Sequence, residues 1–119
     1  MKSDIRVFLC DDEHFRFFGE GPCRLLHSIE ETGSLRAAAM SMGMAYTKAL
    51  AIMKRAEKNL GFPLTARKIG GKGGGGSILT REAKEFLNDY ETYRDACTRT
   101  SRELYTQIFS KYHEDGRGE

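Results

Sequence analysis

Apolar residues recur at steps of three and four over much of this chain, the pattern of helices that bury one face. The first such stretch has Pro22 at its first helical position, where the missing N–H costs nothing, and it stops at Gly33. Ser34 follows directly and is predicted to cap a second, short helix, which Gly43 interrupts. A third helix is predicted from about 45 to 60. Three helices in close succession therefore make up the middle of the chain.

Alternating and glycine-rich stretches flank these helices. Residues 4–10 alternate apolar and polar side chains, which predicts a strand, and residues 15–18 are a candidate return strand. Short strands are also predicted at 64–67 and 77–79. The nine residues 68–76 between them include six glycines, so they predict a hairpin with an open loop and not a packed core.

A fourth helix is predicted from residue 81, with Thr80 as its N-cap. Unbroken over 81–112 it would extend about 48 Å, which is longer than one side of a small domain. Most of its apolar side chains therefore need a partner, and we expect them to join two copies of the chain. The residues predicted to form this seam are Phe86, Tyr90, Tyr93, Cys97, Leu104 and Ile108.

The second and third helices, with the hairpin that follows, match the spacing of a winged helix-turn-helix. If Gly43 is the turn glycine, Ala39 lies four residues earlier, where only a small side chain fits between the two helices. Met42 and Met44 flank the turn as expected core contacts, and Ile52 is expected to face inward. Several constraints are thus met together.

Charge is concentrated in one part of the chain. The 119 residues carry 19 basic and 17 acidic side chains, a net charge of +2, but residues 45–84 carry nine basic and two acidic ones. A basic segment between acidic ends is typical of a protein that meets a polyanion through one face. Charge alone leaves open a second interpretation, a solvated basic face with no partner.

The polar face of the third helix is predicted to enter the major groove of DNA, which is wide enough for one helix. Its first turn would reach base edges and its later turns phosphates, while the glycine-rich wing at 68–77 would lie on the backbone or in the minor groove. The residues expected to contact DNA are Ser34, Arg36, Tyr46, Thr47, Lys48, Lys54, Arg55, Lys58, Arg67, Lys72, Gly73 and Gly74.

The predicted fold is mostly α with a small β wing: a winged helix-turn-helix followed by a long C-terminal dimerisation helix. We assign residues 1–80 to the DNA-binding domain, 81–113 to the dimerisation helix and 114–119 to a frayed tail. The sequence leaves open a break near Thr98–Ser101, because a T-x-x-E capping box begins at Thr100. Such a break would fold the end of the helix back onto its own domain.

Other classes of function have little support. No apolar run is long enough to span a membrane, no signal peptide is evident, and three widely spaced cysteines suggest no disulfides, so we expect a cytoplasmic protein. No catalytic arrangement of Ser, His, Asp or Cys is present, so neither an enzyme nor a cofactor is expected. Cys23 and His27 lie one helical turn apart, but without a second pair at ligand spacing no metal site is predicted.

Five stretches carry a resemblance to a known family. They are F-G-x-G at 18–21, L-L-x-x-I-x-x-T-G-S-L-x-x-A-A at 25–39, M-G-M-A-Y-x-x-A at 42–49, G-G-K-G-G-G at 70–75 and L-T at 79–80. In combination they resemble the N-terminal DNA-binding domain of molybdate-responsive (ModE-type) transcriptional regulators, relatives of the LysR-type winged helices. About sixty per cent of the chain is covered.

The resemblance implies a homodimeric DNA-binding transcriptional regulator. Ala45 stands where the family has Ser, which removes a side-chain N-cap from the recognition helix, and Leu50 stands where the family has Trp. The family's molybdate-binding domain would follow the fourth helix, and since the sequence ends at Glu119 no molybdate site is expected in this chain. The alternative is a winged-helix protein–protein interaction module without sequence-specific DNA binding.

Overall fold

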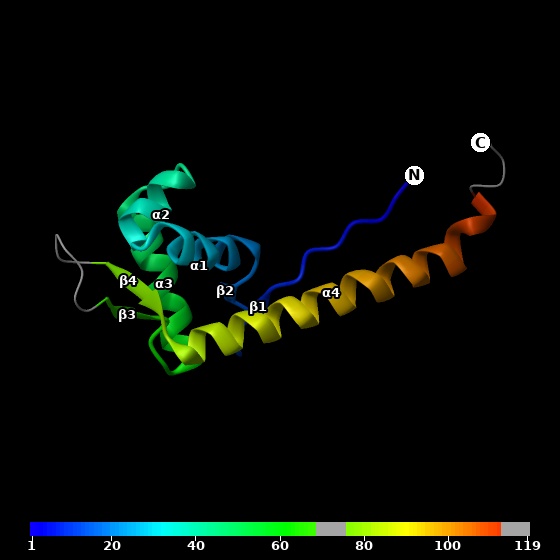
Figure 1. The fold of residues 1–119 in the computed structure, drawn as a ribbon. Coiled ribbons are helices and arrows are strands. Elements are labelled where there is room, and N and C mark those ends of the chain that lie inside the picture. Colours follow the sequence, from blue (N-terminus) through cyan, green and yellow to red (C-terminus); the bar gives the residue numbers. More distant parts are fainter. Residues whose placement is uncertain (69–75, 113–119) are drawn as a thin grey trace. The chain divides into compact units, whose positions relative to one another are not determined.

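The computed structural model describes residues 1–68 and 76–112; residues 69–75 and 113–119 lie outside this description. The elements in chain order (Figure 1) are β1 Leu9–Cys10, β2 Arg16–Phe18, α1 Glu20–Thr32, α2 Leu35–Ser41, α3 Tyr46–Leu60, β3 Thr65–Arg67, β4 Ser77–Leu79, α4 Arg81–Phe109 and the short 3-10 helix η1 Ser110–Tyr112. The chain forms two compact units, Phe8–Asn88, called here the winged unit, and Met1–Val7 with the chain from Asp89 onward, called the arm–helix unit.

The hairpin β1–β2 is shorter than the alternating pattern predicts. Its antiparallel register pairs Leu9 with Phe18 and Cys10 with Arg16, with an irregularity between the two pairs. The prediction of a strand over residues 4–10 was wrong for all but its last two residues. An alternating pattern forms a ladder only where a neighbouring strand lies alongside it, and β2 has three residues.

Helix α1 begins two residues earlier than predicted. Gly19 is the N-cap, and the first intrahelical hydrogen bond runs from the N–H of Cys23 to the carbonyl of Gly19 at 3.0 Å. Pro22 is therefore the third helical residue and not the first. The first four N–H groups of a helix have no intrahelical acceptor, so a proline there still costs nothing. Gly33 ends the helix with φ +86°, as predicted.

The turn between α2 and α3 has the predicted glycine. Ser34 caps α2 by accepting a hydrogen bond from the N–H of Ala37 at 2.9 Å, and Gly43 lies in the left-handed region with φ +66°. The N–H of Met44 donates to the carbonyl of Ala39 at 2.9 Å, so the chain folds back tightly onto α2. Ala39 is 1% exposed, which confirms the small contact residue.

The core of the winged unit is formed by apolar faces from every helix of the unit. The two methionines that flank the turn, Met42 and Met44, are only half-buried, because the turn passes over the edge of the core. The start of α4 belongs to this core as well: the ring of Phe86 lies edge-on to that of Phe18, with centroids 4.8 Å apart. The fully buried side chains of the unit are Phe18, Cys23, Leu25, Leu26, Ile29, Ala38, Ala39, Ala49, Met53, Ala56, Leu64, Leu79, Ala83 and Leu87.

The wing hairpin is anchored to the turn between α1 and α2. Strands β3 and β4 pair antiparallel, and the N–H of Ser77 donates to the carbonyl of Gly33 at 2.7 Å. A Cβ on Gly76 would lie 2.9 Å from the same carbonyl oxygen, closer than real Cβ contacts come. Glycine is therefore required at residue 76 by close approach of another backbone.

Helix α4 runs unbroken from Arg81 to Phe109, so the sequence alternative of a break near Thr98–Ser101 is excluded. Thr80 caps it, with its hydroxyl oxygen accepting from the N–H of Ala83 at 3.0 Å. Within residues 1–68 and 76–112 no helix is both long and apolar enough to cross a membrane.

Candidate nucleic-acid interface

The two faces of α3 differ as the sequence predicts. Ala49, Met53 and Ala56 are buried against the core. The opposite face is exposed and consists of Thr47, Lys48, Ala51, Lys54, Arg55 and Lys58. Helix periodicity alone places these residues on one side, and the packing of α1 and α2 against the other side leaves them facing outward.

The cations of this face keep their charge uncompensated. The ion pairs within the described part of the chain include none of Lys48, Lys54, Arg55 and Lys58. The one carboxylate of α3, on Glu57, is half-buried and accepts a hydrogen bond from the backbone N–H of Leu64 at 2.8 Å. It holds the loop after the helix, so the exposed face of α3 carries positive charge alone.

Arg36 and Tyr46 bring the starts of α2 and α3 together. The guanidinium carbon of Arg36 lies 4.3 Å from the centroid of the Tyr46 ring, within the range of a cation–π contact. A stacked guanidinium is held in one orientation, and its N–H donors stay available at the edge of the plane. The pair therefore presents a positioned cation beside the first turn of α3.

The helix starts at this face differ in how they are capped. Ser34 caps α2 with its hydroxyl oxygen, which leaves the hydroxyl proton as a donor. Ala45, at the N-cap of α3, makes no side-chain hydrogen bond, as the sequence predicts for a position that lacks Ser. No side chain of the N-cap residue therefore occupies the first N–H groups of α3. These groups lie at the N-terminal end of the helix, where the helix dipole favours anions.

The base of the wing adds further cations. Arg67 is exposed at the end of β3, opposite Ser77. Lys68 follows it, exposed, with its N–H donating to the carbonyl of Gly76 at 3.0 Å. The predicted wing-tip contacts Lys72, Gly73 and Gly74 lie outside the described residues.

Two features of this surface were not predicted from the sequence. Lys68 belongs to the basic segment but is not among the predicted DNA contacts. Its position next to Arg67, at the base of the hairpin, would have indicated it. The pairing of Arg36 with Tyr46 had no signal, because the two residues are ten positions apart on different helices.

The residues predicted to join two copies fall into two groups. Phe86 is half-buried among aromatic rings of the winged unit, and Tyr90 is buried with its hydroxyl donating to the carbonyl of Val7 at 2.7 Å. The side chains further along α4 are open: Tyr93 is 56%, Leu104 48% and Ile108 54% exposed. Cys97, between them, is half-buried.

Helices α1–α3 with the β3–β4 hairpin are a winged helix-turn-helix, which confirms the predicted fold class. Two solved structures share it. The DNA-binding domain in a CbnR–DNA complex matches with a TM-score of 0.56 and 21% identity, over 73% of this chain and 94% of that one. VV2_1132, a LysR-family transcriptional regulator, matches with a TM-score of 0.53 and 17% identity, over 75% of this chain and 29% of that one.

In sequence, the N-terminal region is similar to ModE regulators. The transcriptional regulator ModE of Haemophilus influenzae is 37% identical over 68 residues, which are 57% of this chain and 27% of that protein. The molybdenum transport protein ModE of Herbaspirillum seropedicae is 39% identical over 72 residues, 60% of this chain and 25% of that protein. The molybdenum-pterin-binding protein MopB of Rhodobacter capsulatus is 35% identical over 66 residues, 56% of this chain and 24% of that protein.

The chain thus spans about a quarter of the length of these curated relatives. No family model matches it. None of the relatives' names describes an enzyme, in agreement with the sequence prediction.

Proposed function

We propose that this chain is a sequence-specific DNA-binding transcriptional regulator that acts as a homodimer. The observation that carries the proposal is the exposed face of α3, which presents four cations that pair with no carboxylate of the described residues, and no exposed carboxylate of its own. In a helix-turn-helix that face belongs to the second helix, the one that enters the major groove. The similarity of the N-terminal region to ModE regulators supports the same assignment.

On this proposal, α3 supplies both readout and anchoring. Tyr46, Thr47 and Lys48 in the first turn reach base edges, while Lys54, Arg55 and Lys58 lie further along and neutralise phosphates. Arg36, stacked on Tyr46, reaches the DNA backbone beside the first turn, and the hydroxyl proton of Ser34 donates to a phosphate oxygen. The stacking fixes the guanidinium before binding, which lowers the entropy lost on contact.

The wing at 68–77 extends this surface. Arg67 and Lys68 at its base are exposed and approach the backbone next to the groove that α3 occupies. Lys72, with the glycines Gly73 and Gly74, supplies the contact at the wing tip, on a phosphate or in the minor groove. The anchoring of β4 to the carbonyl of Gly33 supports a fixed starting point for this contact.

The homodimer is joined through α4. Because Phe86 and Tyr90 are already engaged within their own chain, we assign the contact to Tyr93, Cys97, Leu104 and Ile108. Two recognition helices related by a two-fold axis read two half-sites, so the operator is a near-palindrome.

Duplex binding at increasing salt, with random duplex as competitor, tests the proposal. We expect log affinity to fall linearly with log salt concentration, with a slope set by the number of phosphate contacts, and a site-dependent part to survive competition. If an equal mass of random duplex abolished binding, that result would contradict sequence specificity. Absence of DNA binding at low salt would favour the alternative, a protein–protein interaction module.

A further inference from the structure

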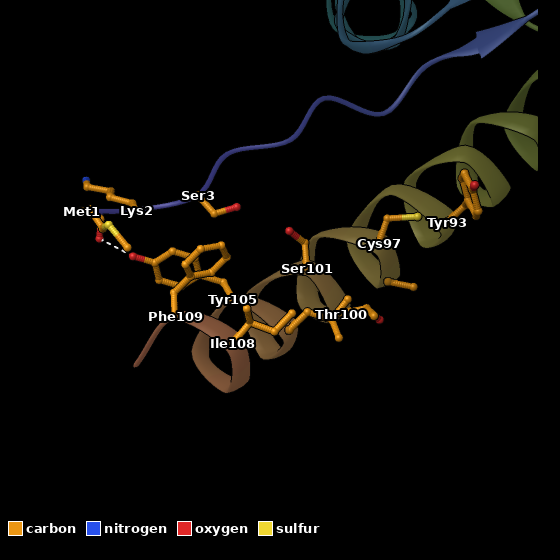
Figure 2. Close-up of a pocket in the computed structure, with 12 residues that line it drawn as sticks. Met1, Lys2, Ser3, Tyr93, Cys97, Thr100, Ser101, Tyr105, Ile108 and Phe109 are labelled. Carbon is orange, nitrogen blue, oxygen red and sulfur yellow. Dashed lines mark hydrogen bonds between the residues drawn. The ribbon is translucent and has the colours of Figure 1, made fainter. Parts of the chain in front are cut away.

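The arm–helix unit has an apolar groove that the DNA-facing residues do not use. The groove has a volume of about 770 Å³ and lies between Met1–Ser3 and the side of α4 that runs from Tyr93 to Phe109 (Figure 2). Among the described residues that line it, Lys2 has the one charged side chain. The groove is therefore built to accept an apolar, uncharged surface.

One wall of the groove is the start of the N-terminal arm, residues 1–7, which two tyrosines hold against α4. The hydroxyl of Tyr90 donates to the carbonyl of Val7, and that of Tyr105 donates to the carbonyl of Met1, both at 2.7 Å. Fifteen helical residues separate the tyrosines, a rise of about 22 Å. Six extended residues separate the two carbonyls, about 20 Å. The matched lengths let the arm run antiparallel to α4 with both ends fixed.

The other wall is one face of α4. Tyr93, Cys97, Leu104 and Ile108 recur at steps that keep them on a single stripe, called here the α4 strip. Side-chain hydrogen bonding with Cys97, followed by a smaller electrostatic effect of the same side chain, raises the pKa of the Tyr93 phenol above its ordinary value. Tyr93 is therefore neutral at physiological pH, and the α4 strip carries no charge.

We propose that the α4 strip of a second copy occupies this groove, so that the arm is part of the dimer interface. The inference rests on the homodimer of the proposed function. It adds to the contact a surface that α4 alone does not provide, the wall formed by the N-terminal arm. Across a two-fold axis each copy can place its strip in the groove of the other, as an isologous contact requires. Among the described lining residues a cationic partner would find no acidic side chain, and an anionic partner would find only Lys2 and the amino end of the chain at Met1.

The arm acts by shape and by its fixed position. With the carbonyl of Met1 hydrogen-bonded to Tyr105, the arm end is held in place before the second copy arrives, and less conformational entropy is lost on association. Loosening the arm should therefore weaken the dimer while the winged unit, whose core does not involve residues 1–7, stays folded.

The test is the dimer dissociation constant, measured by sedimentation equilibrium without DNA. Tyr105→Phe removes one hydroxyl and should raise the constant about three- to tenfold. The matched control is Tyr112→Phe, an exposed tyrosine outside the groove, which should change it less than about twofold. Deletion of residues 2–4 keeps the Val7–Tyr90 bond and should raise the constant at least about tenfold. Circular dichroism verifies that each variant is folded.

The outcomes separate this inference from the proposed function. A wild-type dimer that neither arm variant weakens would overturn the role of the arm and leave the DNA-binding proposal intact. A wild-type chain that stays monomeric up to the highest attainable protein concentration would overturn both the groove assignment and the homodimer. Failure to bind DNA, measured separately, would overturn the proposed function without touching the dimer.

Discussion

The winged unit and the arm–helix unit differ in where their apolar side chains lie. Among the described residues, every fully buried apolar side chain except Tyr90 belongs to the winged unit. The arm–helix unit instead leaves Tyr93, Leu104 and Ile108 about half exposed along one stripe. The winged unit also exposes apolar side chains, Phe15, Met40 and Ile78, but these lie far apart in the sequence, whereas those of α4 share one stripe. A continuous exposed stripe is the pattern expected of the proposed dimer contact.

The exposed surfaces of the two units differ in charge as well. The outward face of α3 carries Lys48, Lys54, Arg55 and Lys58, while the α4 strip carries no charge. The first surface suits a polyanion and the second an apolar partner. We therefore expect the proposed DNA contact and the proposed self-association to respond to different substitutions.

The largest expected effect is on the core of the winged unit. Leu26→Ala removes a side chain that is fully buried and should lower the free energy of unfolding by about 2–5 kcal/mol. Leu104→Ala, in the half-exposed strip, should lower it by less than about 1 kcal/mol in dilute protein. Urea unfolding at low concentration measures both. Equal losses would contradict the contrast between the units.

A charge in the α4 strip should separate the copies. Leu104→Lys places an ammonium group in the proposed contact and should raise the dimer dissociation constant about a hundredfold, because the charge has no partner there. Thr106→Lys adds the same charge to the opposite side of the helix and should have little effect. Sedimentation velocity over a concentration series distinguishes them; similar behaviour of the two variants argues against the strip as the contact.

Much of this organisation was predictable because it depends on local spacing. Glycines in the left-handed region end α1 and α3 at Gly33 and Gly61, and helix periodicity identified the cationic face of α3. The prediction of the first strand was wrong for residues 4–8 because alternation alone does not specify a neighbouring strand for them to pair with. In this chain the backbone of that stretch is held at Val7 by the hydroxyl of Tyr90, eighty-three positions away, and sequence spacing carries no record of such a contact.

The same limit applies to the candidate site. The cations of α3 were predicted one by one, but the stacking of Arg36 on Tyr46 depends on the angle at which α2 meets α3. The capping box that begins at Thr100 does not end the helix in the structure. A continuous α4 keeps every backbone hydrogen bond through that turn, whereas a break would remove several of them.

The wing can be tested as part of the winged unit through Gly76. Gly76→Ala would push a methyl group to within 2.9 Å of the carbonyl oxygen of Gly33 and should cost about 1–3 kcal/mol of unfolding free energy. Gly21→Ala is the control, since a Cβ there meets nothing within 4 Å, and it should be neutral or stabilising. Thermal melts that rank the two variants the other way would show that the wing base tolerates movement.

Base readout by α3 predicts a specific effect for Lys48. Lys48→Ala should reduce discrimination between operator variants by about 1–3 kcal/mol, with the fold and the dimer unchanged. Fluorescence anisotropy on a set of single-base operator variants measures it. A loss of affinity that is uniform across the set would reassign Lys48 to a phosphate.

The smallest expected effect is at the wing tip. Lys72→Ala should reduce affinity several-fold and make the slope of log affinity against log salt shallower by about one unit for each subunit that contacts DNA. The same titration on Lys111→Ala, an exposed lysine of the arm–helix unit outside the groove, should leave the slope unchanged. An unaltered slope for Lys72→Ala removes the wing from the DNA contact.

Selection from a random duplex pool by the full chain tests sequence readout and two-fold symmetry at once. We expect enrichment of a near-palindromic sequence whose half-sites lie about one helical turn or more apart. We also expect Leu104→Lys to retain weaker binding to single half-sites. A pool that shows no enrichment over its starting composition, although the protein is folded and dimeric, would contradict the assignment of α3 as a recognition helix.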